Sequence, residues 1–110
     1  MLANLQNVPM TPEDWRAWLW SHRASHDKIR AAVAASKGAN LPSYALEPVE
    51  PSGFDLFFQN NQNAHTEMND VLGLQTSDML AVDTTNTESF TRWIQDHYQE
   101  HFDAETALGI

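Results

Sequence analysis

The sequence predicts an all-α protein in which three helices pack as a bundle. In three separate stretches, apolar or histidine residues recur at alternating steps of four and three, and segments containing proline or glycine separate these stretches. All five histidines of the 110-residue chain lie on these three patterns, which we call the core stripes. The stripes are Trp15, Leu19, His22, His26, Ile29 and Val33; Phe54, Phe58, Asn61, His65, Met68 and Leu72; and Phe90, Ile94, His97, His101, Ala104 and Leu108.

The chain divides into a short arm and one domain. Residues 1–10 are expected to form an extended N-terminal arm that makes apolar contacts through Leu2, Leu5 and Val8. Residues 11–110 are expected to form a single three-helix domain, because a chain of this length encloses one hydrophobic core.

The helix boundaries follow from capping residues. The first helix is expected from Thr11 to about Ala35, the second from near Ser52 to Gly73, and the third over residues 87–108. Thr11 and Ser52 have hydroxyl groups that can accept hydrogen bonds from the first free amides of a helix. Each helix is followed by a glycine, the residue that most readily takes the left-handed conformation at a helix end.

The three stripes also suggest an internal repeat. The second lies 39 residues after the first and the third 36 residues after the second, and Trp18, Phe57 and Trp93 hold one equivalent position beside them. We expect three tandem repeats of an extended lead-in plus a helix, arranged with pseudo-threefold symmetry and joined by long irregular connectors. Such connectors can run back along a helix, so parallel helices are slightly preferred over an up-down-up order.

Aligned stripes place two polar layers inside the core. One consists of His22, Asn61 and His97, and the other of His26, His65 and His101. Buried imidazoles need partners. A hydrogen-bonded layer that fixes helix register is the favoured interpretation, since a neutral imidazole has one donor and one acceptor.

The alternative is a metal site. His26, His65 and His101 come from three helices at one level and resemble a three-nitrogen zinc site with a fourth position open to water, which His22 or His97 could join. No carboxylate lies on the stripes to orient the imidazoles, and this weakens the metal interpretation. The nearby acids are expected to face outward: Asp27, Glu67, Asp96 and Glu100.

Charge is distributed unevenly along the chain. Residues 1–37 have five basic and three acidic side chains, a net charge of +2, whereas residues 38–110 have one basic and twelve acidic side chains, a net charge of −11. The total of −9 disfavours nucleic-acid binding, which needs clustered lysine and arginine. No stretch approaches the ~20 apolar residues of a membrane span, so no membrane partner is expected.

One face of the first helix has interface candidates. Arg16, Arg23 and Arg30 recur every seven residues, and Lys37 continues the series. They either pair with the protein's own acids on a solvated face or dock an acidic partner or a second copy. Trp20 falls off the stripe and is a candidate interface anchor.

Enzymatic chemistry has little support. Without cysteine there is no disulfide, thiolate ligand or catalytic thiol. Nothing matches a nucleophile elbow or a glycine-rich phosphate loop. We therefore expect no enzyme activity and no cofactor, zinc being the alternative.

Five segments resemble small uncharacterised proteins encoded by tailed bacteriophages. They are Trp18-Leu-Trp-Ser-His22-Arg-Ala-Ser-His26, the stretch from Phe57 to Asn69, Leu41-Pro-Ser-Tyr44, Asp78-Met-Leu-Ala-Val-Asp83, and the Trp93…His97…His101…Ile110 ending. This resemblance implies a phage setting and a role in the virion, with the host cytoplasm as the place of assembly. It brings no catalytic residues with it.

The function expected first is that of a phage structural protein in the capsid or the head–tail region. Its partners would be other phage structural proteins or copies of itself. Two alternatives stay open: a metal-binding protein that uses the buried three-histidine layer, and a soluble phage protein that binds a host partner.

Overall fold

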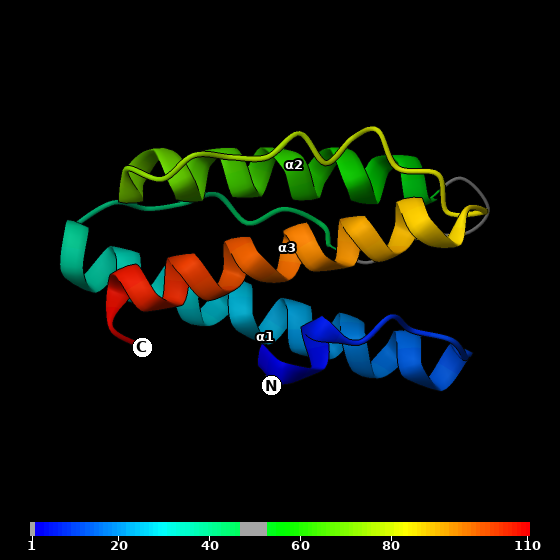
Figure 1. Cartoon of the computed structure of the whole chain (residues 1–110). Helices are drawn as coiled ribbons and strands as arrows, with labels where there is room; N and C mark the ends of the chain where they lie inside the picture. Colours follow the sequence, from blue (N-terminus) through cyan, green and yellow to red (C-terminus); the bar gives the residue numbers. More distant parts are fainter. Residues whose placement is uncertain (1, 47–52) are drawn as a thin grey trace.

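The chain folds as three α-helices that follow a short 3-10 helix. The computed structural model describes residues 2–46 and 53–110 (Figure 1), and within these ranges it has no β-strand. The all-α prediction is confirmed. The elements are η1 (Leu2–Gln6), α1 (Pro12–Lys37), α2 (Gly53–Leu72) and α3 (Thr87–Leu108).

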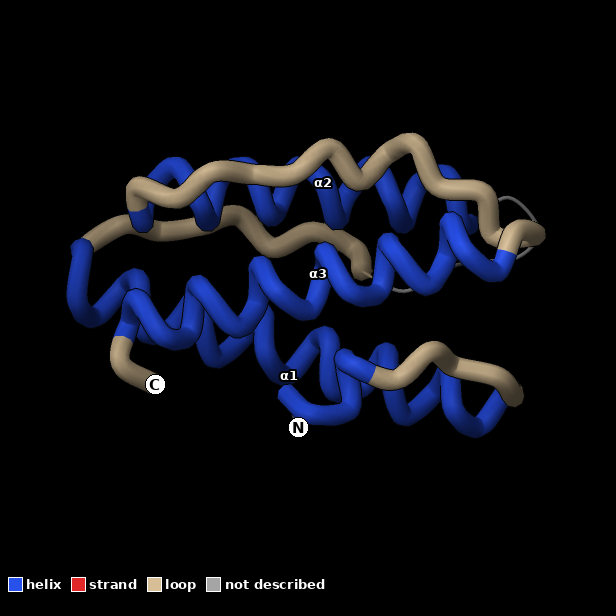
Figure 2. Tube along the Cα trace, viewed as in Figure 1, coloured by secondary structure: helices blue, strands red, loops and turns tan. Residues whose placement is uncertain are grey.

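The three α-helices run in the same direction. In Figure 1 each begins at the right of the view and ends at the left, and the described parts of the connectors run back along the bundle, as the tube in Figure 2 also shows. The first residues of the three core stripes lie at one level along the bundle. The ring centroid of Trp15 is 5.6 Å from that of Phe54 and 5.6 Å from that of Phe90. The three stripes therefore start in register, as expected for parallel helices.

Caps define the helix ends largely as the sequence indicates. The Thr11 side chain accepts a hydrogen bond from the Asp14 amide at 3.1 Å, and the Asn86 side chain accepts one from the Ser89 amide at 2.9 Å. Gly38 ends α1 with φ of 65°, a left-handed conformation that favours glycine. Because this cap lies beyond Lys37, α1 ends two residues later than predicted. The predicted Ser52 cap lies outside the described residues.

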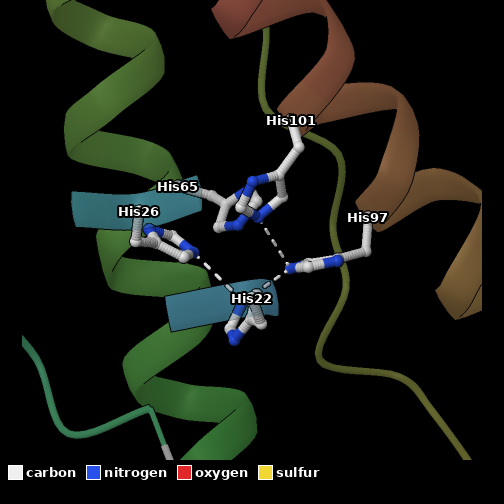
Figure 3. A group of neighbouring side chains, drawn as sticks. All are labelled: His22, His26, His65, His97 and His101. Carbon is white, nitrogen blue, oxygen red and sulfur yellow. Dashed lines mark hydrogen bonds between the residues drawn. The ribbon is translucent and has the colours of Figure 1, made fainter. Parts of the chain in front are cut away.

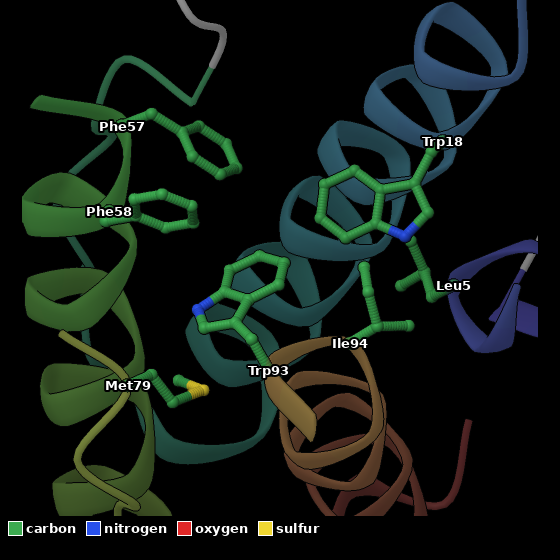
Figure 4. Packing of buried hydrophobic residues seen from close by; sticks show 7 residues of the cluster. All are labelled: Leu5, Trp18, Phe57, Phe58, Met79, Trp93 and Ile94. Carbon is green, nitrogen blue, oxygen red and sulfur yellow. The ribbon is translucent and has the colours of Figure 1, made fainter. Parts of the chain in front are cut away.

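The apolar core has two parts, one on each side of the histidines. The first lies toward the starts of the helices (Figure 4), and the second toward their ends. The buried members of the first are Leu5, Trp18, Phe57, Phe58, Met79, Trp93 and Ile94. Those of the second are Ile29, Val33, Met68 and Ala104. Every core-stripe residue is buried or half-buried.

The N-terminal arm is not extended over its first part. Leu2–Gln6 form η1, so the prediction of an extended arm is wrong for these residues, and residues 7–10 of the described part of the arm lack helical structure. In a 3-10 helix, side chains three positions apart lie on one side. This conformation lets Leu2 and Leu5 both pack on the first core cluster, and Leu5 is completely buried there. The Asn4 side chain also donates to Ser21 Oγ at 3.0 Å.

Amide side chains of α2 hold both connectors against the bundle. Asn60 donates to the carbonyl of Ala45 at 2.9 Å. Gln62 donates to the carbonyl of Ser77 at 3.1 Å and accepts from the Met79 amide at 2.9 Å. These bonds satisfy backbone groups that have no helical partner.

Candidate metal centre

Five histidines from three helices converge in the middle of the bundle. His22 and His26 come from α1, His65 from α2, and His97 and His101 from α3 (Figure 3). One ligand atom from each lies within 4.8 Å of the ligand atoms of all the others. The two layers predicted from the stripes therefore form a single group, which we call the histidine cluster. His26 is 5% exposed and the other four rings are fully buried.

The Nε2 atoms of four rings face one another at the centre. Nε2 of His22 lies 3.1 Å from Nε2 of His26 and 2.9 Å from Nε2 of His97, and Nε2 of His101 lies 3.1 Å from Nε2 of His97. The Nε2 atom of His65 is buried and has no hydrogen-bond partner among the described residues.

Asn61 contacts two rings of the histidine cluster on the side of the first apolar core cluster. Its Oδ1 atom lies 3.0 Å from Nε2 of His22 and 3.1 Å from Nε2 of His97. The same two rings stack on indoles: His22 on Trp18 with ring centroids 4.8 Å apart, and His97 on Trp93 at 4.7 Å. The indole pair predicted beside the stripes thus forms one wall of the site.

A carboxylate orients His65, against the sequence-based expectation. Glu100 was expected to face outward, but it is only 6% exposed, and its Oε1 atom lies 2.9 Å from Nδ1 of His65. Asn69 donates to the same oxygen at 3.1 Å, and the Ser77 amide donates to Oε2 at 2.8 Å. Although burial opposes its ionisation most strongly, hydrogen bonds from His65 and Ser77 lower the pKa of Glu100 below its ordinary value.

A second polar relay reaches His101. The hydroxyl of Ser25 donates to Oε2 of Glu105 at 2.7 Å, and its oxygen lies 2.8 Å from Nδ1 of His101. Lys28 donates to the other oxygen of Glu105 at 3.1 Å. The sequence analysis missed Ser25, Asn69 and Glu105 as parts of the site.

A seven-residue spacing in the sequence indicates two of the residues that orient the imidazoles. Ser25 follows the buried Trp18 by seven positions, and Glu100 follows the buried Trp93 by seven. Two helical turns return nearly to the same face, so both side chains lie on the flank that the indoles occupy. That flank is inside the bundle, which is why Glu100 does not face solvent.

Burial favours the neutral form of four of the five imidazoles. Loss of solvation, with the nearby His65, lowers the pKa of His22 to about 3, although its hydrogen bond to Asn61 opposes this. Loss of solvation also sets the pKa of three other rings well below 6.5, and neighbouring histidines add to the effect. These rings are His26, His97 and His101.

Proton counting shows an excess of lone pairs at the centre. Nδ1 of His65 faces the Glu100 carboxylate and so bears a proton, and in the neutral ring this leaves Nε2 bare. Ser25 gives its proton to Glu105 and therefore accepts from Nδ1 of His101, which leaves that Nε2 bare as well. Where two Nε2 atoms meet at 2.9 to 3.1 Å, only one of them can bear a proton.

The bare nitrogens match the donor set of a metal ion. Metal-bound imidazole characteristically donates its other N–H to a carboxylate or another acceptor, as His65 does directly and His101 does through Ser25. With metal–nitrogen bonds of about 2.0–2.1 Å, two ligands at a right angle are about 2.9 Å apart and two at the tetrahedral angle about 3.3 Å. The contacts of 2.9 to 3.1 Å between Nε2 atoms fall at or near this range.

The predicted trio is contiguous. Ring centroids lie 5.0 Å apart for His26 and His65, 4.6 Å for His26 and His101, and 4.8 Å for His65 and His101. His22 and His97, predicted as possible additional ligands, lie in the same cluster.

The predicted interface residues lie on the surface of α1. Trp20 is 64% exposed. Arg16 approaches Glu13 at 4.0 Å, and Arg30 approaches Asp27 at 3.4 Å, so part of the basic face pairs with acids of the same helix. Arg23 is also exposed.

Comparison with protein-family models, with curated proteins and with solved structures found no match. The resemblance to phage proteins thus stays a prediction. None of the helices described above is long and apolar enough to span a membrane. The fold and the site together describe a parallel three-helix bundle built around a buried histidine cluster.

Proposed function

We propose that this protein binds one divalent first-row transition-metal ion through the Nε2 atoms of the histidine cluster. The observation that carries the proposal is the convergence of five buried imidazoles whose ligand atoms all lie within 4.8 Å of one another. A hydrogen-bonded network without metal leaves at least two bare Nε2 atoms, those of His65 and His101, facing the centre. A cation would offset this excess of lone pairs.

The donor set indicates which ions fit. Imidazole nitrogen suits zinc, copper, iron and nickel ions. Tetrahedral zinc takes four ligands, so it would leave at least one of the five rings unused, whereas ions that accept five or six ligands use them all. Because four of the rings are fully buried, we infer that the site retains its ion and contributes to the stability of the fold.

Elemental analysis and a metal titration test this proposal. The purified protein should contain close to one transition-metal ion per chain, and the stripped protein should bind one Co²⁺ with a change in visible absorption. His65→Ala should weaken this binding strongly. Met68→Leu is the matched control, since Met68 is buried one turn further along the same stripe and supplies no nitrogen. Absence of stoichiometric metal, together with no Co²⁺ binding, would contradict the proposal and favour the hydrogen-bonded layer.

A docking role is supported by a different observation. Trp20 is 64% exposed on the helix that has the basic residues, and a large exposed aromatic side chain is typical of an interface anchor. This feature is compatible with the expected phage structural protein and with binding to a host protein. A mass-spectrometric inventory of purified virions tests the first role, and absence of the chain from every particle would contradict it.

We further propose that the three helices and their lead-ins are tandem copies about a pseudo-threefold axis. Residues 39 and 36 positions apart lie at one level, as Trp15, Phe54 and Phe90 do. His22, Asn61 and His97 repeat this relation two levels further along. Superposition of the three units in an experimental structure tests the proposal, and units whose lead-ins follow unrelated paths would contradict it.

A further inference from the structure

The five rings of the histidine cluster lie at five corners of an octahedron. His101 is in ring contact with each of the other four, at centroid distances of 4.5 to 5.3 Å. Those four form a cycle in which neighbouring centroids lie 4.6 to 5.0 Å apart (Figure 3). The order around the cycle is His22, His26, His65 and His97. This arrangement is a square pyramid with His101 at its apex.

The ring pairs across the cycle are separated as opposite corners should be. Within the described part of the chain, neither His22 and His65 nor His26 and His97 are in ring contact, although their ligand atoms lie within 4.8 Å. For metal–nitrogen bonds of about 2.0–2.1 Å, neighbouring ligands of an octahedron are about 2.9 Å apart and opposite ligands about 4.1 Å. The contacts of 2.9 to 3.1 Å between Nε2 atoms all join neighbouring corners. The sixth corner lies opposite His101.

The side chain of Asn61 lies on the side of this sixth corner. Its Oδ1 atom is 3.0 Å from Nε2 of His22 and 3.1 Å from Nε2 of His97, and these two Nε2 atoms are 2.9 Å apart. The three atoms form a nearly equilateral triangle. Its sides match a face of an octahedron, at about 2.9 Å, better than a face of a tetrahedron, at about 3.3 Å.

Hydrogen bonds cannot satisfy all three sides of this triangle. An amide oxygen has no proton, and each neutral imidazole has at most one on Nε2. If both His22 and His97 donate to Oδ1, neither Nε2 can accept at their contact of 2.9 Å. If only one of them has a proton on Nε2, another side joins two bare acceptors. A cation beside the three atoms makes all of these contacts favourable.

The amide group of Asn61 has no evident structural role. Asn61 is fully buried, and its Nδ2 atom has no hydrogen-bond partner among the residues that the structure describes. An unpaired buried amide is costly, and a leucine of nearly the same size would avoid that cost. The equivalent positions of the other two core stripes are His22 and His97. Asn61 therefore supplies an oxygen donor where the other stripes supply a nitrogen donor.

We propose that Oδ1 of Asn61 is the sixth ligand of the metal centre, which is a closed site of five imidazole nitrogens and one amide oxygen. The inference rests on the proposed function, because it concerns the same ion. All six corners then belong to the chain, so the ion has no position for water or a substrate. Ni²⁺ and Fe²⁺ fit this site, since they suit imidazole and accept six ligands, whereas structural zinc is four-coordinate.

The visible spectrum of the Co²⁺-loaded natural chain tests the coordination number. Six-coordinate Co²⁺ absorbs weakly, because its surroundings are nearly centrosymmetric, and the absorption becomes stronger with five ligands and with four. The natural chain should show the weak spectrum at one Co²⁺ per chain. An intense spectrum of the four-coordinate kind would overturn the sixth ligand and leave metal binding intact.

Asn61→Leu removes the oxygen and keeps the size of the side chain. Its Co²⁺ spectrum should become more intense as the coordination number falls to five. Ni²⁺ affinity, measured by chelator competition, should fall at least about tenfold, the loss that even partners behind the ligands typically cause. Zn²⁺ affinity should change much less, since zinc needs only four of the rings. Asn63→Leu makes the same replacement at an exposed position of α2 and should leave the spectrum and both affinities unchanged.

Asn61→Asp keeps an oxygen ligand and adds a negative charge that offsets the ion. It should retain the weak Co²⁺ spectrum and bind Ni²⁺ at least as tightly as the natural chain. This variant decides the matter if circular dichroism shows that Asn61→Leu does not fold. Weaker Ni²⁺ binding by a folded Asn61→Asp chain would overturn the inference.

The outcomes separate this inference from the proposed function. Stoichiometric binding with a spectrum and a Ni²⁺ affinity that Asn61→Leu leaves unchanged would show that Asn61 is not a ligand, and the metal centre would stand with five imidazoles. Failure of the natural chain to bind either Co²⁺ or Ni²⁺ would contradict the metal centre itself.

Discussion

At the scale of single residues, the site depends on side chains that lie behind the imidazoles. Glu100 and the Ser25–Glu105 pair determine which nitrogen of His65 and of His101 bears the proton. They thereby direct bare nitrogens toward the centre. In metal proteins, replacing a residue in such a position typically costs 10- to 100-fold in metal affinity.

Glu100→Gln should weaken metal binding about 10- to 100-fold while the five imidazoles stay in place. The amide keeps the shape of the side chain but loses the negative charge that orients His65 and offsets the ion. Chelator competition measures the change. Glu67→Gln is the control, because Glu67 accepts a hydrogen bond from Tyr44 at 3.0 Å, and among the described residues no hydrogen bond joins it to a histidine. Equal affinity in both variants would contradict the role of Glu100.

Ser25→Ala should destabilise the protein by about 1–3 kcal/mol even without metal. It removes the hydroxyl that links His101 to Glu105, and both remaining groups are buried. Urea unfolding of the stripped protein measures this loss. The matched control is Ser36→Ala, since Ser36 is exposed and its hydroxyl donates to the carbonyl of Ala32 in the same helix. A loss no larger than that of the control would show that the relay contributes nothing to stability.

At the scale of elements, alternating steps of four and three predicted which residues enter the core. They placed all five histidines inside, and Thr11 and the glycines marked the helix ends, because these features depend on local backbone geometry. Glu100 escaped prediction because a charged residue one position before a stripe histidine ordinarily faces water. Its partners come from α2 and from the connector that follows α2. Ser25 and Glu105 likewise meet across 80 positions of sequence, beyond any local pattern.

η1 shows the same limit of local patterns. Its five residues have no strong helix signal, and their conformation follows from packing Leu5 against α1 and α3. Leu5→Ala should therefore cost about 2–5 kcal/mol of stability, as for other fully buried leucines. Leu80→Ala, at a position 45% exposed, is the control and should cost far less. Similar urea midpoints for the two variants would show that η1 is not an integral part of the domain.

At the scale of the whole molecule, the histidine cluster replaces apolar packing in the middle of the bundle. The two apolar clusters lie on either side of it. A neutral cluster is compatible with this core, whereas a protonated one places like charges in contact without solvent. The global stability of the metal-free protein is therefore tied to the protonation of its centre.

The metal-free protein should lose stability as the pH falls below about 6.5. The pKa of His22 is about 3 in the folded chain, and burial also holds the pKa values of His26, His97 and His101 well below 6.5. Between these folded values and 6.5 the unfolded chain binds more protons than the folded chain, so acid favours unfolding. Each such group contributes about 1.4 kcal/mol per pH unit. Over two units His22 alone contributes on the order of 3 kcal/mol, a substantial part of the stability of a small domain, and the other three rings act in the same direction. Thermal melts of the stripped protein should agree between pH 8 and pH 7 and fall steeply by pH 5. Coincident melts at pH 8 and pH 5 would contradict burial of neutral imidazoles.

A bound ion should raise the melting temperature at pH 8 and lose this effect as protons displace it.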